Sequence, residues 1–325
     1  MATRIEELVS IVKDHRVFIQ THNYPDPDAV GAAYGLQFLL QNYGIDASII
    51  YQGSLNKMYG LRMIDYFGIL MKNADEIDLK EEDYIIIVDA QKYNKNCTDL
   101  IGDEVACIDH HPTMIECDYK YKDVRLVGAC STLIAEYIIE SGVTPPEDVA
   151  SALVYGMKMD TADFSRGVTE LDAKMYYELF PYVDHHSIEK LQVNTIAFTD
   201  LQAYGAAINN INAYKRAGYA CIPFDCPDAL IAIISDFILA LDLIDFSVVY
   251  SIRPGGYKFS VRSEDDNLDA GKITNQVLHS LGNGSGGGHA FMAGGFLPME
   301  EVNKLGENPR KVIEKTFNQV IYPED

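Results

Sequence analysis

The sequence has no tryptophan, no long apolar run and few positive charges. Its 325 residues hold 26 lysines and arginines against 48 aspartates and glutamates, a formal net charge of −22. Such a surface repels long polyanions and argues against a protein that tracks along duplex nucleic acid. No apolar run reaches the roughly 18 to 20 residues of a membrane span, so no membrane association is expected.

Cysteine is sparse as well. The six residues, at positions 97, 107, 117, 130, 221 and 226, are scattered and form no CxxC pair. The first residues lack the apolar segment of a signal peptide. These features predict free thiols in a reducing cytoplasm, rather than a disulfide framework or a zinc knuckle.

Apolar strands alternate with helices over the first 186 residues. Strands are expected at 17–20, 47–51, 84–88 and 105–108, and helices at about 3–14, 28–43, 130–141, 146–158 and 169–180. This alternation predicts an α/β domain with a parallel sheet.

The rhythm changes after residue 186. Residues 187–205 predict a connecting helix, and two hairpins follow, around 215–218 and around 253–256. With further helices at about 227–240 and 272–281, residues 206–325 predict a smaller α+β domain with a mixed or antiparallel sheet.

Acids and imidazoles follow the expected strands. Because the carboxyl ends of parallel strands meet at one edge of a sheet, these groups are expected to lie together. Prolines 25 and 27 stiffen the first of these turns. Mixed imidazole and carboxylate ligands suit Mn²⁺, Fe²⁺, Co²⁺ or Zn²⁺ better than Ca²⁺ or Mg²⁺. The candidates at strand ends are His22, Asp26, Asp28, Asp89, Asp109, His110 and His111, and a fourth element, after the helix expected at about 146–158, adds Asp160.

A second copy of the triplet, Asp184-His185-His186, follows what is expected to be a helix end. Neither triplet by itself would exceed chance. The second copy lacks the accompanying acids of the first, so we expect it to have no role in a metal site.

The segment Gly282–His289 is rich in glycine and includes a GxGxxG pattern. A helix, not a strand, is expected before it, which argues against a dinucleotide-binding turn. Two interpretations stay open: a flexible surface loop, or a backbone at Gly287 and Gly288 that approaches phosphate beside His289. Arg262, followed by Ser263 at the end of an expected strand, suits phosphate binding, although such an arginine is often only a surface residue.

Taken together, these motifs resemble those of a known family. HxxPDxDAxG, a strand-terminal VD, DHH, a DT after a helix, and GGGH occur in the order of the DHH phosphoesterase superfamily with a DHH-associated C-terminal domain. The pairing resembles the bacterial oligoribonuclease and phosphoadenosine-phosphate phosphatase (nanoRNase) branch. The resemblance implies a catalytic metal-binding domain over 1–186, a linker helix over 187–205 and a substrate-binding domain over 206–325.

The resemblance also implies roles for residues. His22 and Asp26 would ligate one divalent ion, and Asp28, His110 and Asp160 a second, with Asp89 bridging two ions that are expected to be Mn²⁺. His111 would contact the scissile phosphate, Asp109 would orient the imidazoles, and Arg262, Ser263, Gly287, Gly288 and His289 would bind substrate phosphate.

The implied reaction is hydrolysis of short oligonucleotides to nucleoside monophosphates, of phosphoadenosine phosphate to AMP, or of both. An inorganic pyrophosphatase or exopolyphosphatase is an alternative, against which GGGH argues because the pyrophosphatase relatives carry a different C-terminal domain. A non-catalytic nucleotide-binding module is a third interpretation, disfavoured by the intact ligand set. A homodimer is an open expectation.

Overall fold

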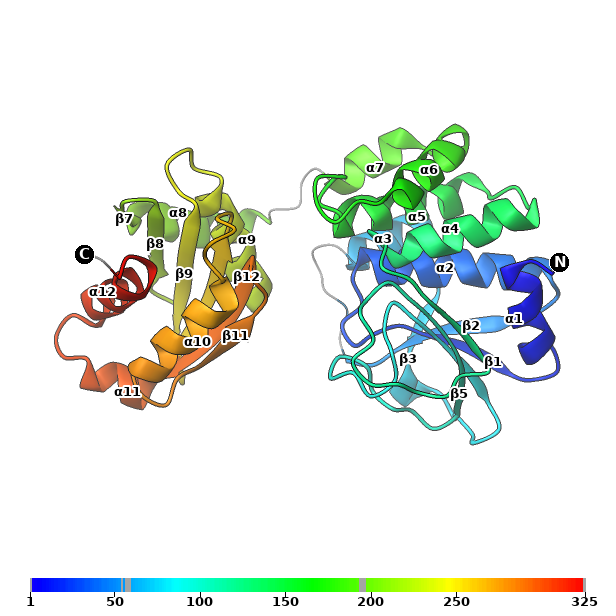
Figure 1. Cartoon of the computed structure of the whole chain (residues 1–325), viewed down its shortest axis with the longest axis horizontal. Coiled ribbons are helices and arrows are strands. Elements are labelled where there is room, and N and C mark those ends of the chain that lie inside the picture. The colour runs from blue at the N-terminus through cyan, green and yellow to red at the C-terminus, as the bar shows by residue number, and fades with distance from the viewer. Residues whose placement is uncertain (1, 54, 56–59, 193–196, 324–325) are drawn as a thin grey trace. The chain divides into compact units, whose positions relative to one another are not determined.

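The computed structural model describes residues 2–53, 55, 60–192 and 197–323. The chain forms two compact units, Met1–Thr195 and Ile196–Asp325 (Figure 1). The strands of the first unit are β1 (Val17–Gln20), β2 (Ala47–Tyr51), β3 (Met71–Asn73), β4 (Tyr84–Val88), β5 (Asp103–Asp109) and β6 (Tyr121–Val124). They form one parallel sheet in the order β3-β2-β1-β4-β5-β6, so the predicted α/β fold of this region is confirmed.

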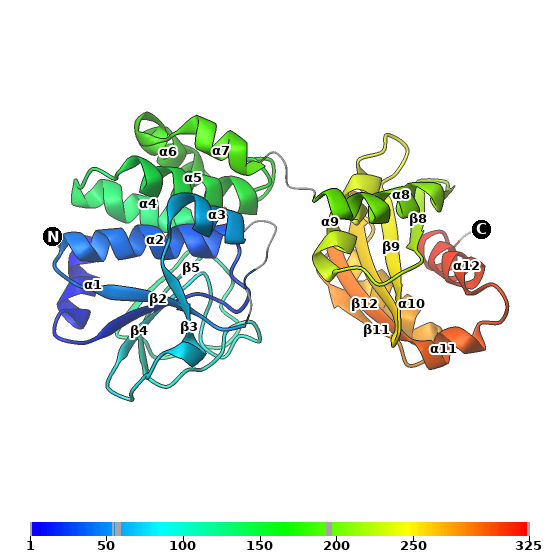
Figure 2. The same ribbon diagram turned by 180° about the vertical axis from the view of Figure 1, so that it is seen from behind.

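Helices cover one face of this sheet, with α2 nearest to it in both views (Figures 1 and 2). They are α1 (Arg4–Val12), α2 (Pro27–Asn42), α3 (Gly60–Phe67), α4 (Cys130–Ser141), α5 (Glu147–Asp160), α6 (Glu170–Leu179) and α7 (His185–Gln192), with 3-10 turns at Ala74–Glu76 and Phe180–Tyr182. Strand side chains alternate between the faces: Val17 and Ile19 join the core under the helices, and Phe18 joins a smaller cluster on the other face.

The strand order reverses between β1 and β4. The chain runs from β1 to β2 on one side, and from β4 to β5 on the other. In open parallel sheets the carboxyl edge at such a reversal is the usual place for a ligand site.

The second unit has a mixed sheet in the order β11-β12-β10-β9-β8-β7, in which only β8 and β9 are parallel. Its strands are β7 (Asn212–Tyr214), β8 (Ala217–Ile222), β9 (Phe246–Arg253), β10 (Gly256–Ser263), β11 (Ser285–Gly288) and β12 (Met292–Pro298). Its helices are α8 (Leu201–Asn209), α9 (Asp228–Leu239), α10 (Ala270–Ser280), α11 (Met299–Lys304) and α12 (Pro309–Ile321), after a 3-10 turn at Phe198–Asp200. One core lies between the sheet and α10 to α12, and another lies under α8 and α9. The predicted mixed α+β unit is thus confirmed.

Three local features differ from the sequence predictions. Helix α2 begins at Pro27, one residue before the predicted start at 28, and Asp26 caps it; the missing N–H of Pro27 costs nothing at the first helical position. Within the glycine-rich segment, Ser285–Gly288 form the edge strand β11, which neither of the two interpretations of the sequence included. The predicted helix over 187–205 includes residues 193–196, which lie outside the described residues; α7 ends before them and α8 begins after them.

The functional limits at residues 186 and 206 stay a prediction. Within the described ranges, no helix is both long enough and apolar enough to cross a membrane.

Candidate metal centre and active site

The first two ligand candidates lie on the turn from β1 into α2. His22 comes two residues after the end of β1, and its Nδ1 is 2.8 Å from the carbonyl oxygen of Asn23. Asp26 caps α2 by accepting the N–H groups of Asp28 and Ala29, both at 3.0 Å. This cap fixes one carboxylate oxygen, and Asp28 enters the buried first turn of the same helix.

Asp89 follows β4 directly and is 2% exposed. Its backbone has φ +58°, in the left-handed region that residues other than glycine rarely adopt. Strain of this kind costs about 1–3 kcal/mol and is concentrated at functional sites. It turns the Asp89 carboxylate from the end of β4 toward the imidazoles that follow β1 and β5.

Asp109 is the last residue of β5 and is fully buried, and His110 and His111 follow it. The Nδ1 atom of His110 lies 3.1 Å from the carbonyl oxygen of Val127. Because a carbonyl can only accept, the Nδ1 atoms of His22 and His110 both carry hydrogen, and their Nε2 atoms remain available as ligands. The backbone thus fixes the orientation of both rings before any ligand binds.

Asp160 is the last residue of α5, and close packing between helices brings it to the site. A Cβ on Gly31 of α2 would lie 2.7 Å from the Ala152 carbonyl oxygen, and one on Gly156 would lie 3.0 Å from that of Pro27. Only glycine therefore allows α2 and α5 to approach this closely. A carboxylate at a helix C-terminus is unfavourable by itself, because the end of the helix dipole is negative there.

The structure brings all these groups together in three overlapping clusters. In each cluster, one potential ligand atom per residue lies within 4.8 Å of the others. The clusters are His22, Asp26 and Asp89; Asp28, His110 and Asp160; and Asp89, His110 and His111. The first two contain residues that the family resemblance groups around two ions, but Asp89, the expected bridge, belongs to the first and third clusters and not to the second.

The distances within the clusters suit ligands around a shared cation. His22 Nε2 lies 3.5 Å from Asp89 Oδ2, and His110 Nε2 lies 3.2 Å from Asp89 Oδ1. His110 Nε2 is also 3.4 Å from Asp160 Oδ2. The Oδ1 atom of Asp89 is buried and accepts no hydrogen bond of good geometry from the described residues, although His110 Nε2 lies 3.2 Å away. A buried carboxylate oxygen without a donor is costly, and a divalent cation would satisfy it.

The crowding of carboxylates shifts the pKa values of the site. Burial alone would lower the pKa of His110, but the nearby acids, foremost Asp89, raise it to about 11. The pKa of His22 is raised to about 11 by Asp26 and Asp89, also against the effect of burial. Burial raises the pKa of Asp160 to about 6. Without another cation, the histidines and a carboxyl must hold protons to balance the charge of the site.

His111 differs from the other two histidines. It is exposed, and its Nδ1 lies 2.9 Å from Asp109 Oδ1. That hydrogen bond raises the pKa of His111, and it holds the pKa of Asp109 below its ordinary value against the effect of burial. Asp109 therefore stays ionised and directs the Nε2 atom of His111 away from itself, where it is free to contact a ligand.

Three residues that the sequence predictions did not include hold these groups in place. Gln91, 2% exposed, donates to Asp109 Oδ2 at 2.7 Å and to the His111 carbonyl at 3.1 Å. The Asn23 side chain accepts hydrogen bonds from the backbone N–H and the hydroxyl of Thr98, and the backbone N–H of Asn23 donates to the carbonyl oxygen of Asn96. These bonds join the loop that carries His22 to the loop that contains Asn96 and Thr98. Asp172 accepts the N–H of Gly128, next to the Val127 carbonyl that orients His110. No sequence period marks such residues, because their partners come from distant segments.

The candidates of the second unit gather at one end of its own sheet. Arg262 and Ser263 end β10, and Gly287 and Gly288 end β11. The register pairs Arg262 with Met292 and Gly288 with Ala293, on opposite sides of the start of β12. Arg262 donates to Asp236 Oδ1 at 2.6 Å, so its charge has a partner within the unit. His289 is exposed in the turn between β11 and β12.

The second triplet lies at the start of α7. Asp184 accepts the N–H of His186 and the hydroxyl of Ser187, as a helix cap does. His186 is exposed, and no potential metal cluster found among the described residues includes any of the three. The local role is therefore to begin a helix.

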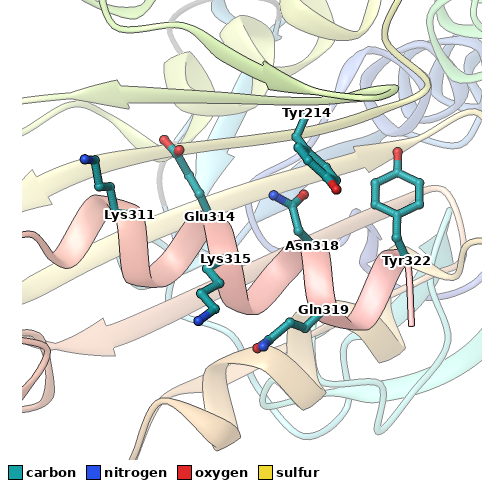
Figure 3. A pocket seen from close by; sticks show the side chains of 7 residues that line it. All are labelled: Tyr214, Lys311, Glu314, Lys315, Asn318, Gln319 and Tyr322. Atoms are coloured by element: carbon teal, nitrogen blue, oxygen red, sulfur yellow. The ribbon is translucent and has the colours of Figure 1, made fainter. Parts of the chain in front are cut away.

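A separate groove of about 490 Å³ lies along α12 in the second unit (Figure 3). It contains none of the predicted site residues. Its lining residues are Tyr214, Lys311, Glu314, Lys315, Asn318, Gln319 and Tyr322.

Comparison with known proteins identifies the class. Residues 16–157 match the N-terminal domain of the DHH family, and residues 216–315 match the DHHA1 domain. The chain belongs to the DHH phosphoesterase superfamily. Within that superfamily it is of the kind that carries a DHHA1 domain.

Individual relatives are distant. An uncharacterized protein of Methanocaldococcus jannaschii is 27% identical over 94% of this chain and 63% of its own length. A probable manganese-dependent inorganic pyrophosphatase of Streptococcus mutans is 25% identical over 59% of each chain. This chain thus spans about 60% of the length of these two relatives. An exopolyphosphatase-related protein of Bacteroides fragilis shares the fold at 19% identity, with a TM-score of 0.71 over 96% of this chain and 97% of that one.

Proposed function

We propose that the protein is a metal-dependent hydrolase of phosphate esters whose substrates are short oligonucleotides or small nucleotides. The observation that carries the proposal is the set of three overlapping ligand clusters, two of which contain Asp89 and two of which contain His110. Two imidazole Nε2 atoms oriented by backbone carbonyls and four carboxylates are a donor set that suits divalent cations.

His22, Asp26 and Asp89 would hold one cation, and Asp28, His110 and Asp160 a second, with Asp89 shared. When bound, divalent cations supply Lewis-acid stabilisation to the phosphoryl group. The proposed metal is Mn²⁺, because the ligand chemistry suits it and the relative in Streptococcus mutans is a probable manganese-dependent enzyme.

The residues around the cations have distinct tasks. His111, exposed and fixed by Asp109, is placed to donate a hydrogen bond to a phosphate oxygen. Gln91 keeps Asp109 in place by donating to its Oδ2 atom. In the second unit, Arg262, Ser263 and the backbone of Gly287, Gly288 and His289 would bind further phosphate oxygens.

Two tyrosines beside the metal ligands favour a nucleotide over a bare phosphate compound. Tyr24, between His22 and Asp26, has φ +58° and is 63% exposed; Tyr93, four residues after Asp89, has φ +67° and is 54% exposed. Bulky residues rarely adopt a positive φ. Because both tyrosines are exposed, burial of their side chains does not offset the free-energy cost of this backbone conformation. These exposed rings, each within four residues of a ligand candidate in the sequence, would instead stack with a base.

Inorganic pyrophosphatase activity is the second candidate, because the relative in Streptococcus mutans carries that function as its probable activity. That similarity covers 59% of this chain. The DHHA1 domain over residues 216–315 and the exposed tyrosines favour the nucleotide substrate.

A substrate panel tests the proposal. Metal-depleted protein, supplied with Mn²⁺, is assayed with a dinucleotide, phosphoadenosine phosphate, pyrophosphate and a 24-residue single strand. We expect turnover of the dinucleotide or of phosphoadenosine phosphate, and none without metal. Faster turnover of pyrophosphate than of both would instead establish the second candidate, and no turnover with any of them would overturn both.

A further inference from the structure

We propose that the groove along α12 is a second nucleotide-binding site, separate from the metal ligands. It would hold a nucleoside phosphate with its base against Tyr214 and Tyr322 and its phosphates toward Lys311 and Lys315. This inference does not depend on the proposed catalytic function. The volume of the groove, about 490 Å³, falls within the roughly 300–1,000 Å³ of small-molecule sites.

The groove is cationic on a protein of net charge −22. Lys311 and Lys315 are exposed, and neither forms an ion pair with any described residue, whereas Lys92, Lys158 and Lys258 all do. Unpaired ammonium groups are the kind that bind phosphate as point charges.

The single acid of the groove is already neutralised. Glu314 is 8% exposed and accepts from Arg310 Nε at 2.9 Å and from Asn212 Nδ2 at 2.8 Å. Its charge is thus paired with Arg310, which is not among the residues that line the groove, and does not cancel the two lysines.

Aromatic groups occupy the other end. Figure 3 shows Tyr214 and Tyr322 near the C-terminal end of α12, with Asn318 beside Tyr214. The two ring centroids are 5.8 Å apart at 60°, so the rings do not cover one another. Tyr214 is 42% exposed. The Lys215 ammonium lies 5.9 Å from the ring centroid of Tyr214 and 4.7 Å from that of Tyr322, so a base would stack on the remaining ring surface beside a third cation.

The spacing fits one ligand across both ends. Lys315 and Lys311 precede Tyr322 by about two and three turns of helix, or roughly 10 and 16 Å along the axis at about 1.5 Å per residue. Lysine side chains can bridge several ångströms of this span, so a base on the tyrosines would place a first phosphate near Lys315 and a second near Lys311. The chemistry is therefore that of a nucleoside diphosphate.

Calorimetric titration of ADP into the full-length chain, in EDTA and low salt, tests the site. Lys311→Gln with Lys315→Gln should raise the Kd for ADP about tenfold, the loss of roughly one charge-assisted contact. Tyr214→Ala should raise it several-fold, and adenosine without phosphate should bind far more weakly. The control, Lys258→Gln with Lys304→Gln, removes the same charge from the same unit and should change Kd less than twofold.

Photo-crosslinking then locates the ligand. With 8-azido-ADP, we expect adducts in the segments around Tyr214 or Tyr322, reduced several-fold in the Lys311→Gln/Lys315→Gln variant but not in the control. Adducts only in the segments of the metal ligands or around His289, an unchanged Kd in the double variant, or no binding of ADP would each overturn the proposal.

Discussion

At the scale of single residues, the site depends on groups that touch no ligand. Asp109 is fully buried, accepts from His111 and Gln91, and stays ionised because its pKa is held low. The same principle applies to His22 and His110, whose Nδ1 atoms face backbone carbonyls. These hydrogen bonds therefore fix the orientation of the imidazole rings before any cation or substrate binds.

The first prediction concerns Gln91. Replacing it with alanine should lower kcat about 10- to 100-fold, as loss of such supporting partners does, because Asp109 loses one donor and His111 loses its fixed position. The bound metal content should stay at the parental level. Gln91→Glu, of similar size, should be worse, since it places a second carboxylate against Asp109. Parental turnover in both variants would show that Gln91 has no positioning role.

The second prediction concerns protons and metal. The pKa values of His22 and His110 are raised to about 11 without metal, so at neutral pH both hold a proton that a cation must displace. Apparent Mn²⁺ affinity should therefore rise as pH increases from 6 to 8, with release of about one to two protons per chain. Calorimetry in buffers of different ionisation enthalpy measures this release. Affinity that is constant with pH would contradict the assignment of these imidazoles as ligands.

At the scale of helices and strands, the elements with a regular spacing of apolar residues could be predicted from the sequence. The expected helix over 130–141 and strands over 47–51 and 84–88 agree with α4, β2 and β4. All ligand candidates except Asp160, which ends α5, were found because they follow apolar strands. Strand β11 could not be predicted, because Ser285–Gly288 has no β-propensity and is a strand only through its pairing with β12.

Helix α12 has a sequence pattern from which it could have been predicted, although no helix was predicted there. Ile313, Phe317 and Ile321 recur at helical spacing and mark α12. Gly156 is different: its requirement arises from the closeness of α2 and α5, which no local pattern reveals. Residues with partners in distant segments, such as Gln91, belong to the same group.

The third prediction concerns the element that repeats the triplet. Asp184 caps α7, and His186 is exposed. Changing His185 and His186 to alanine should leave turnover within about a few-fold of the parent, because surface substitutions usually cost little. The matched variant His110→Ala should lose activity and metal. A loss of several orders of magnitude in the first variant, without unfolding, would mean that the wrong triplet was chosen.

At the scale of the whole molecule, charge governs which nucleic acids can bind. The net charge of −22 repels a long polyanion, whereas a short one encounters mainly the local charge of a site. Substrates of about two to five nucleotides should be turned over much faster than a 24-residue strand at equal concentration. Equal rates on a dinucleotide and on the 24-residue strand would contradict this expectation.

The central claim is that Asp89 is shared between two cations that the reaction requires. The most direct measurement determines bound Mn²⁺ and dinucleotide hydrolysis on the same preparations of the parent protein and Asp89→Asn, with His186→Ala as control. The parent and the control should bind two Mn²⁺ per chain and be active, whereas Asp89→Asn should stay folded, lose at least one Mn²⁺ and lose hydrolysis. Parental metal content together with parental turnover in Asp89→Asn would contradict the claim.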